Sequence, residues 1–427
     1  MYNLPDVHAG RTAAVQADAH DPLARYRNQF VISDDRIVYF DGNSLGRMPI
    51  QTAAHLHHVI HQEWGDGLIR GWGRGWYEAP ARVGDKIGQL IGAAPGQVIA
   101  CDSTSVNLYK VLMAALGARA DRREIVSDAL NFPSDLYIIQ GAIAQYGHRH
   151  VLKLVTSTDN EITVTPDDLY ALITPNTAVV VLSHVTFKSG FIYDMQAITA
   201  RAHAVGALVI WDLSHSAGAV PMQLDAWQVD FAVGCCYKFL NGGPGAPAFL
   251  YVNAAIQHQV VSPIWGWFGQ NAPFAFDLSY TPAPGLARFL AGTPPMLSLS
   301  AVEASVEMLV AVGMDAIRAK SVALTRYMIA LYDHVLAQHG FTLGSPRDTA
   351  MRGSHVSIRH PHGYQINQCL IAEMHVIPDF REPDNLRLGL SPLTTSFCEV
   401  YDGVMRIHDV MVSQRYQQYD TARKAVT

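Results

Sequence analysis

Short, almost continuously apolar runs recur through the middle of the chain and alternate with amphipathic stretches. Seven runs have the length and composition of strands: 97–101, 124–128, 151–154, 178–184, 207–212, 231–235 and 247–252. Stretches such as 105–117, 135–146 and 194–205 carry apolar residues at helical spacing. Runs such as AVVVLSHV and ALVIWDL predict strands that are buried on both faces, which is typical of parallel sheets covered by helices. The pattern therefore predicts an α/β fold with a mainly parallel sheet and helices on both faces.

The pattern changes after about residue 300. A long helical stretch, 300–338, precedes the short segments HVSIRH, HVIPDF and NLRLGLSP, and a further helix is expected from Ser396 onward. This mixture predicts a smaller α+β domain, which residues 1–39 are expected to join because they precede the first sheet-like segment. The expected division is a large cofactor-binding domain of residues 40–300 and a small domain of residues 1–39 with 301–427.

Composition and charge narrow the class of protein. The 427 residues are 49% hydrophobic and 16% charged, which fits a well-buried enzyme and argues against disorder. A net charge of −6 provides no polybasic field for nucleic acid or anionic lipid. No apolar run has the length or position of a signal peptide or a bilayer span, and the five cysteines form neither a disulfide framework nor metal-ligand spacing. We expect a cytoplasmic protein that binds neither nucleic acid nor a membrane.

A lysine, Lys238, ends an apolar run just before a loop rich in glycine and proline, within GCCYKFLNGGPG. Burial of a lone ammonium favours the neutral amine, which is a nucleophile. Asp212 ends an earlier apolar run 26 residues before Lys238, so both side chains are expected at the sheet edge where ligands bind in such folds. The two groups could form a plain ion pair at a strand edge. Alternatively, they suit pyridoxal phosphate (PLP), which needs a lysine amine and a carboxylate beside its ring nitrogen.

A phosphate group would need a partner of its own. In CDSTSVNLYKVL a strand ends at Cys101, and Ser103, Thr104 and Ser105 open a helix. Hydroxyls and free N–H groups at a helix N-terminus form an anion site, although an ordinary Ser/Thr cap has the same appearance. No P-loop or dinucleotide fingerprint follows a first strand, so neither nucleotide-binding mode is predicted.

Motifs spread along most of the chain resemble the kynureninase family. They are YFDGNSLGRMP (39–49), NFPSD (131–135), SHVTFKSG (183–190), WDLSHSAGAV (211–220), CYKFLNGGPG (236–245), GWFG (266–269) and FLAGTPPML (289–297), and the matches extend to RLGLSP (387–392). The resemblance implies a fold-type-I PLP enzyme with an aspartate-aminotransferase-like large domain. It implies hydrolysis of L-kynurenine to anthranilate and L-alanine through a PLP Schiff base, in tryptophan degradation and NAD biosynthesis. It also implies a homodimer with its active site at the subunit interface.

The resemblance assigns roles to individual residues. Lys238 is similar to the Schiff-base lysine and Asp212 to the partner of the ring nitrogen, and Tyr237 is a candidate proton relay. The expected cofactor-binding set also contains Thr104, Ser105, Phe132, Pro133, Ser134, Asp135, Ser183, His215, and Trp267 and Thr293 from the partner subunit. Arg387 is expected to bind the substrate α-carboxylate, with Ser44 and Trp72 near the aromatic end of the substrate. A buried arginine between leucines needs an anionic partner, so a structural ion pair is the other interpretation of Arg387.

The sequence leaves more than one possible substrate and more than one possible reaction. Family members that prefer 3-hydroxykynurenine have a histidine and an asparagine near the substrate ring, and Trp72 and Thr293 take those places here. A ring hydroxyl without a partner costs roughly 1–3 kcal/mol, so kynurenine is expected to be the better substrate. An aminotransferase would use the same lysine and aspartate. A cysteine desulfurase would need a mobile loop cysteine, whereas Cys235 and Cys236 belong to a strand-like run. A non-catalytic cofactor-binding protein is disfavoured by the intact set of candidate residues.

A cluster of histidines invites a metal interpretation: His55, His57, His58 and His61. Apolar residues at positions 53, 56, 60 and 64 instead predict an amphipathic helix whose histidines mostly face solvent. We therefore expect no metal site there.

Overall fold

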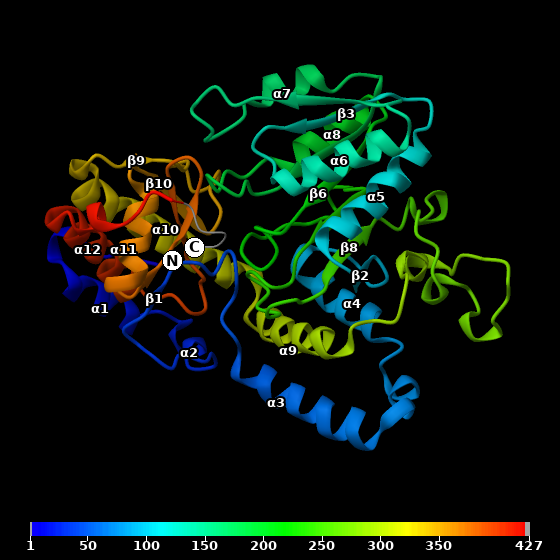
Figure 1. Cartoon of the computed structure of the whole chain (residues 1–427), viewed down its shortest axis with the longest axis horizontal. Coiled ribbons are helices and arrows are strands. Elements are labelled where there is room, and N and C mark those ends of the chain that lie inside the picture. Colours follow the sequence, from blue (N-terminus) through cyan, green and yellow to red (C-terminus); the bar gives the residue numbers. More distant parts are fainter. Residues whose placement is uncertain (1, 423–427) are drawn as a thin grey trace.

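A seven-stranded sheet of order β2-β8-β7-β6-β5-β3-β4 organises the larger part of the chain (Figure 1). The computed structural model describes residues 2–422. Strands β3 to β7 are parallel to one another, and β8 is antiparallel to both of its neighbours. All seven predicted strands are present within one residue of their expected bounds: β2 (Val98–Cys101), β3 (Glu124–Asp128), β4 (Val151–Val155), β5 (Thr177–Ser183), β6 (Leu208–Asp212), β7 (Phe231–Gly234) and β8 (Ala248–Val252).

Helices cover both faces of this sheet because its central strands are apolar on both sides. In β5, Val180 and Leu182 belong to one hydrophobic core, and Val179 and Val181 belong to the other. The first core includes α4 (Ala79–Ile91), α7 (Pro166–Leu172), α8 (Met195–Ala204) and α9 (Met296–Val312), and the second includes α5 (Thr104–Ala118) and α6 (Pro133–Gln145). The predicted α/β class with a mainly parallel sheet is confirmed.

A second group of elements surrounds a four-stranded antiparallel sheet of order β12-β13-β10-β9. Its strands and helices are β9 (Thr342–Leu343), β10 (His355–Arg359), β12 (Asp379–Arg381), β13 (Asn385–Gly389), α10 (Met314–Leu331), α11 (Gly363–Glu373) and α12 (Phe397–Ser413). Near the N-terminus, α1 (Arg11–Ala19) and α2 (Ala24–Arg27) precede β1 (Val38–Tyr39), which pairs in parallel with β11 (Val376–Ile377).

The N-terminal residues share a hydrophobic core with the C-terminal part. Ala14, Val38 and Phe40 pack in one cluster with residues from α10, β10, α11, β13 and α12. This cluster supports the predicted pairing of residues 1–39 with 301–427. The exact division stays a prediction, since Phe30 and Ile317 pack in a core of the larger part instead.

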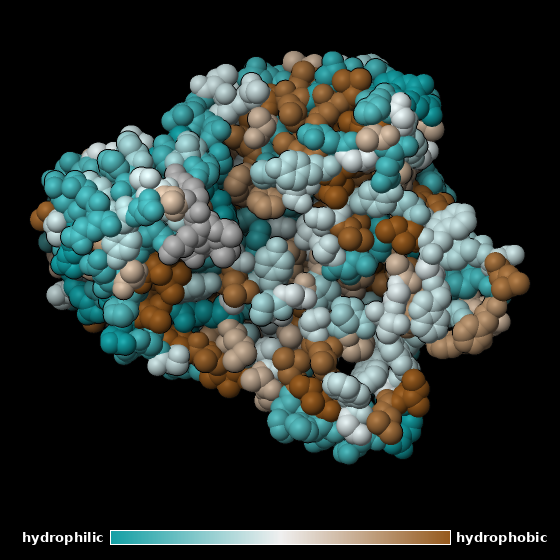
Figure 2. Space-filling view, in the orientation of Figure 1, coloured by the Kyte–Doolittle hydropathy of each residue, from teal (hydrophilic) through white to brown (hydrophobic). Residues whose placement is uncertain are grey.

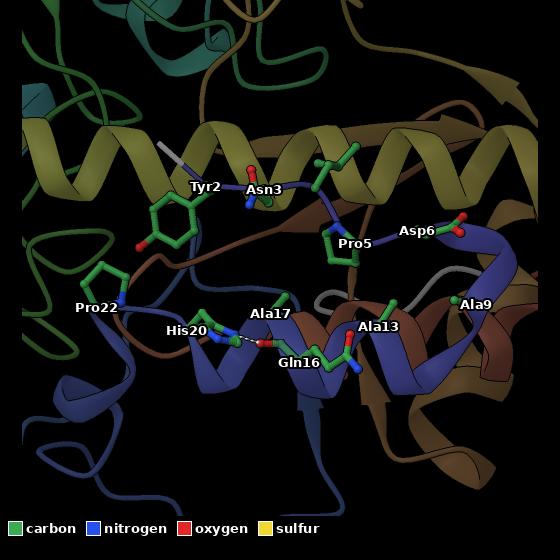
Figure 3. A pocket seen from close by; sticks show the side chains of 11 residues that line it. Tyr2, Asn3, Pro5, Asp6, Ala9, Ala13, Gln16, Ala17, His20 and Pro22 are labelled. Carbon is green, nitrogen blue, oxygen red and sulfur yellow. Dashed lines mark hydrogen bonds between the residues drawn. The ribbon is translucent and has the colours of Figure 1, made fainter.

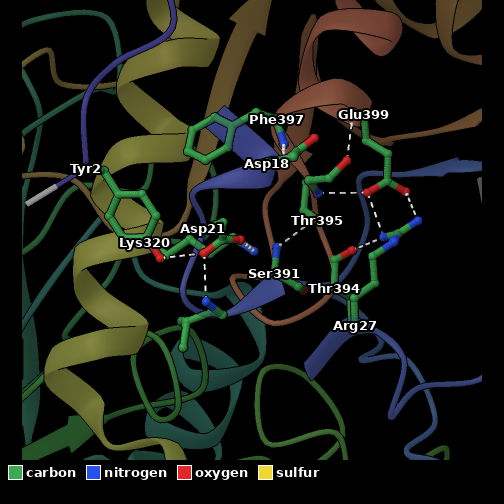
Figure 4. A network of polar contacts seen from close by, with 12 residues as sticks. Tyr2, Asp18, Asp21, Arg27, Lys320, Ser391, Thr394, Thr395, Phe397 and Glu399 are labelled. Carbon is green, nitrogen blue, oxygen red and sulfur yellow. Dashed lines mark hydrogen bonds and ion pairs between the residues drawn. The ribbon is translucent and has the colours of Figure 1, made fainter. Parts of the chain in front are cut away.

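Polar contacts fasten the same N-terminal segment (Figure 4). Lys320 forms a buried ion pair with Asp21 at 2.7 Å, and Tyr2 Oη donates a hydrogen bond to the same carboxylate. Asp18 accepts from the first backbone N–H groups of α12, at Phe397 and Cys398. Because an unpaired buried charge is costly, these contacts hold the segment in one register against the C-terminal helices.

Two local predictions are wrong. The single helix expected at 300–338 is broken into two. The first, α9, ends before Gly313, which has φ +84°, and α10 then runs at 84° to it. The predicted apolar stripe of the histidine helix α3 (Ile50–His58) also fails, because Ala53, Ile60 and Trp64 are exposed. Its buried face carries Thr52 and the following Val59, since α3 packs on α9 and this contact decides which side is covered.

The histidines of the predicted cluster lie mostly on the surface of the protein. His57, His58 and His61 are exposed, and the rings of His57 and His61 lie 4.3 Å apart. Between residues 2 and 422, no group of three or more His, Cys, Asp and Glu side chains is placed to hold a metal ion. Over the same residues no single helix is long and apolar enough to cross a membrane. The bent pair of α9 with residues 314–339 meets that test only by length and composition.

Candidate active site

A cavity of about 210 Å³ lies at the carboxyl edge of the large sheet and extends to the four-stranded sheet. Its walls bring together segments from both groups of elements. It is lined by Ser44, Thr104, Ser105, Phe132, Ser134, Asp135, Asp212, Ser214, His215, Tyr237, Lys238, Arg381 and Arg387. Most of the residues singled out in the sequence therefore lie around one space.

Lys238 stands four residues beyond β7, where the chain turns into the glycine-rich loop. Its Nζ lies 3.4 Å from both ring nitrogens of His215 and 5.9 Å above the ring centres of Phe132 and Tyr237. Burial, followed by the charges of Lys238 and Arg387, holds the pKa of His215 well below its usual range. The lysine amine therefore lies beside an uncharged imidazole, which places no second positive charge next to it.

Two carboxyl groups meet on the opposite wall. Asp212, the last residue of β6, accepts a 2.7 Å hydrogen bond from the backbone N–H of Ser214. Asp135, in the first turn of α6, lies beside Asp212 in the cavity wall, and burial together with the Asp212 charge raises its pKa well above the usual range. Oδ2 of Asp135 is buried and has no hydrogen-bond partner among the described residues. Two carboxyl groups in contact favour a cationic N–H between them or beside them.

The third wall is formed by the first turns of two helices. Ser103 caps α5 by accepting from Val106 N–H, which leaves the N–H groups at the start of the helix directed outward. Ser105 Oγ lies 2.9 Å from Ser134 Oγ in α6, so the hydroxyls of both helices converge. Behind them the fully buried Lys110 is ion-paired with Asp102, which precedes the cap. Hydroxyls and helix N-termini in this arrangement fit a phosphate dianion.

Arg387 closes the cavity from β13. It is 2% exposed and donates to Phe187 O at 2.7 Å, to Ser44 Oγ at 2.8 Å and to the carboxylate of Asp379. Its cross-strand neighbour in the register is the same Asp379. Arg387 therefore forms the structural ion pair of one interpretation and also lines the cavity, and its binding of a substrate carboxylate stays a prediction.

Several predicted residues do not reach the cavity within this chain. Ser183 lies behind it and donates to Asn131 at 2.7 Å, which in turn accepts from the N–H of Phe132. Pro133 begins α6 next to the lining residues. Trp267 and Thr293 are exposed, and Trp72 packs against Phe268 with the ring centres 5.7 Å apart. The resemblance assigned Trp267 and Thr293 to a partner subunit, and a single chain does not bring them to the site.

Ser214 and Arg381 line the cavity although neither was singled out in the sequence. Ser214 was hidden inside WDLSHSAGAV, between the two residues that drew attention. For Arg381 a signal existed: it stands two positions after Asp379 in a short β-like segment, so the two side chains are expected on one face. The segment was too short to be assigned a strand with any register.

The arrangement fits PLP. An amine for an aldehyde, a carboxyl pair for a protonated ring nitrogen and an anion site for a phosphate lie around one cavity, at Lys238, Asp212 and Ser105 respectively. The ring of Phe132 is held perpendicular to Phe187 at 5.3 Å and provides a flat wall for a ring. The unpartnered oxygen of Asp135 is the observation that most favours a cationic ligand.

A larger cavity of about 650 Å³ lies elsewhere, between the N-terminal segment and α1 (Figure 3). Its lining is mostly small or apolar, and its ionisable side chains are Tyr2, Asp6 and His20. His20 Nδ1 is already hydrogen-bonded to Gln16 O at 2.7 Å. This cavity has neither a cation nor a carboxylate pair in its wall, so the smaller one is the candidate active site.

Comparisons with known proteins agree with this geometry. Residues 317–407 match the family model "Kynureninase C-terminal domain", and residues 68–223 match the "DegT/DnrJ/EryC1/StrS aminotransferase family". The chain is 44% identical to a kynureninase from Pseudomonas fluorescens over 413 residues, covering 96% of this chain and 97% of the relative. It is also 44% identical to a kynureninase from Burkholderia pseudomallei over 420 residues, covering 97% and 99% of the two chains.

Solved structures show the same fold at low identity. The apo cysteine desulfurase from Thermococcus onnurineus superposes with a TM-score of 0.77 at 18% identity, covering 91% of this chain and 98% of that one. A C-DES mutant with glycine covalently linked to its PLP cofactor also gives a TM-score of 0.77 at 18% identity, covering 90% and 99%. At this identity the superpositions establish the fold and nothing finer.

Proposed function

Because the chain belongs to the kynureninase family, and is therefore a PLP-dependent hydrolase, we propose that it cleaves L-kynurenine to anthranilate and L-alanine in the cavity around Lys238. One observation supports this site above all others. Lys238, Asp212 and Arg387 come from three separate segments, and all of them line the same cavity. Those are the groups needed to bind an aldehyde cofactor, to keep its ring cationic and to hold an amino-acid carboxylate.

Bound PLP supplies an aldehyde that reacts with amines and a ring that withdraws electrons from the bonds of the bound amino acid. Lys238 would hold that aldehyde through its amine. The same amine, 3.4 Å from the neutral ring of His215, would take the α-proton of the bound substrate and return it at a later stage. Asp212, supported by its hydrogen bond from Ser214 N–H, keeps a proton on the ring nitrogen.

Arg387 and Tyr237 act on the substrate from the other sides. Arg387 is fixed by three acceptors, so its guanidinium presents one orientation to the α-carboxylate and directs the α-hydrogen toward Lys238. Burial raises the pKa of Tyr237, which keeps its hydroxyl protonated. We assign to it the proton that is passed to and from the substrate after water has attacked the γ-carbonyl carbon.

A second copy of the chain completes this site in the proposal. Large apolar side chains are exposed on the segment after β8, with Trp265 at 64%, Phe274 at 60% and Phe276 at 75% exposure. Ile69 is 76% exposed on the neighbouring segment, and Tyr77 joins the two segments by contacts with Phe268 and Phe274. Figure 1 shows the segment after β8 projecting at one edge of the molecule, and Figure 2 shows hydrophobic residues gathered there and beyond α3.

A surface on which several large apolar side chains are exposed together favours burial against a partner. Trp267 contacts Phe274 on this segment, Thr293 is exposed just before α9, and in the proposal a twofold arrangement brings both to the cavity of the other copy. Trp72 lies beside it, in contact with Phe268. The proposal is therefore a homodimer in which each cavity receives side chains from both chains.

The same residues bear on substrate choice. Trp72 and Thr293 offer no pair of groups like the histidine and asparagine that accompany preference for 3-hydroxykynurenine. A buried hydroxyl left without a partner costs about 1–3 kcal/mol, which corresponds to roughly 5- to 150-fold in kcat/KM. We therefore propose kynurenine as the better substrate, and comparable kcat/KM values for the two substrates would contradict this.

The proposed activity is tested by mixing purified, PLP-loaded protein with L-kynurenine and following anthranilate by its fluorescence. Anthranilate and L-alanine should appear in equal amounts without any added keto acid. A requirement for pyruvate, with pyruvate consumed, would identify an aminotransferase instead. The Lys238→Ala variant, which should release no anthranilate, is the control for a contaminating activity.

A further inference from the structure

We propose that Arg381 is a second binding group for the substrate α-carboxylate, and that Arg381 and Arg387 share Asp379 between them. This inference rests on the proposed function, because it identifies a further residue that recognises the substrate at the same site. It differs from the single-arginine arrangement expected from the sequence.

The register of the small sheet places the three side chains on one face. Asp379 is paired with Arg387 across β12 and β13, and Arg381 is two residues further along β12. Alternate residues of a strand share a face, so Arg381 lies beside the pair and not behind it. Arg381 and Arg387 both line the cavity, and Arg381 Nη2 lies 2.9 Å from Asp379 Oδ2, the oxygen that also accepts from Arg387.

Two arginines and two aspartates face one another at this wall, and Arg381 is the more exposed of the two cations. The side chains of Arg387 and Asp379 are each 2% exposed and form a compensated pair, so Arg387 supplies fixed geometry but little net attraction. Arg381 is 36% exposed, and its Nη2 lies beside the same carboxylate. Asp41 is the other carboxyl that faces this group, and burial together with Asp379 raises its pKa to about 6. Asp41 can therefore give up its negative charge when a substrate carboxylate arrives.

Buried N–H groups without acceptors also support a carboxylate at this position. The Nε atoms of Arg381 and Arg387 are both buried, and neither has an acceptor among the described residues. A buried N–H without an acceptor is costly, and more so when it is part of a charged group. A carboxylate has two charged oxygens and can accept hydrogen bonds from two guanidinium groups at once. A single uncharged carbonyl oxygen is a weaker acceptor for the same two groups.

The competing role for Arg381 is stabilisation of the γ-carbonyl oxygen, where negative charge develops during attack by water. The two roles differ in what they do to kinetics. A carboxylate contact exists in the bound substrate and in bound L-alanine, so its loss raises KM and the dissociation constant of the product. A contact with the γ-oxygen strengthens only in the transition state, so its loss lowers kcat.

The test uses the PLP-loaded enzyme and three variants: Arg381→Met, Arg381→Lys and, as a matched control, Arg347→Met. Arg347 is also paired with an aspartate, Asp333, but lies away from the cavity. L-Alanine is titrated against the cofactor absorbance, and kcat and KM are measured for L-kynurenine. Cofactor absorbance and a thermal melt establish that each variant is loaded and folded.

Arg381→Met should raise the dissociation constant of L-alanine and the KM of kynurenine roughly 30-fold each, which corresponds to the approximately 2 kcal/mol of a charged hydrogen bond, with kcat within about 3-fold. Arg381→Lys should recover part of the loss, because a lysine keeps the charge but not the fork. Arg347→Met should match the wild type. If Arg381→Met does not fold, Arg381→Lys alone must show a rise of at least about 5-fold.

A dissociation constant for L-alanine that stays within about 2-fold in the Arg381 variants would overturn the proposal. A fall in kcat with unchanged L-alanine binding would also overturn it and assign Arg381 to the γ-oxygen. If wild-type protein released no anthranilate, the proposed function would fail. The L-alanine titration would still decide the role of Arg381 in that case.

Discussion

The pair formed by Asp379 and Arg387 leads to an asymmetric prediction about stability. Replacing Asp379 with alanine should destabilise the protein much more than replacing Arg387 with methionine. After Asp379→Ala, the buried Arg387 keeps the uncharged acceptors Ser44 Oγ and Phe187 O and the His215 ring at 3.5 Å, and it faces Arg381 without their shared carboxylate. After Arg387→Met, the carboxylate of Asp379 still has Arg381 at 2.9 Å and the Ser44 hydroxyl at 3.2 Å.

The magnitudes follow from burial. Both side chains of the pair are 2% exposed, and breaking a buried pair by removing one partner typically costs about 3–5 kcal/mol. That full cost applies to Asp379→Ala. Arg387→Met leaves the charge of Asp379 compensated, and its main penalty is two acceptors that lose a donor, about 1–2 kcal/mol in total. The expected difference between the variants is therefore on the order of 2–3 kcal/mol.

Urea unfolding followed by circular dichroism measures both values, first on PLP-free protein and then on the loaded form. The denaturant slope should stay unchanged, so that the shift in midpoint reports stability. Equal costs, or a larger cost for Arg387→Met, would refute the shared-carboxylate account. A folded Arg387→Met protein also has a practical consequence, since any weaker binding of L-alanine would then reflect the missing contact and not a damaged fold.

Three further predictions concern the interface, the cofactor site and pH. Phe276→Asp should convert a dimer into monomers in sedimentation experiments and abolish activity with it, because a charge is placed in the proposed apolar contact; an unchanged dimer would exclude that surface. Ser105→Ala should weaken PLP binding about tenfold through loss of one hydrogen bond to the phosphate while leaving the fold intact, and unchanged affinity would move the phosphate elsewhere. Asp41 has a folded pKa of about 6, above that of an unfolded aspartate, so its ionisation penalises the folded state as the pH rises from 4 to 6. Relative to the wild type, the free energy of unfolding of Asp41→Asn should therefore rise by on the order of 2 kcal/mol between pH 4 and 7. A difference between the two proteins that stays constant over this pH range would contradict the prediction.

The sheet was predictable because its central strands are short and apolar on both faces, and few other structures bury such runs. The turn after α9 was not, since the apolar pattern continues across Gly313 and only the glycine marks the break. The face of α3 was predicted wrongly because packing against α9, a contact distant in sequence, decides burial there. Periodicity within one helix does not contain that information.

Some contacts of the candidate site could be predicted from the sequence and others could not. Asp212 and Lys238 could be brought together from the sequence, since residues that follow parallel strands meet at one edge of the sheet. The contact of Asp135 with Asp212, and the sharing of Asp379 by two arginines, depend on the approach of a helix and on a cross-strand register. The places of Trp267 and Thr293 depend on a second chain, and no property of one chain fixes them.

The identity of the lysine that carries the cofactor can be measured directly. Borohydride reduction of the PLP-loaded protein, followed by proteolysis and mass spectrometry, fixes the cofactor to the amine that holds it. We predict a single phosphopyridoxyl group on Lys238 of the peptide that contains CYKFLNGGPG. A modification on Lys110 or on any other lysine, with Lys238 left free, would contradict the site on which the proposed reaction depends.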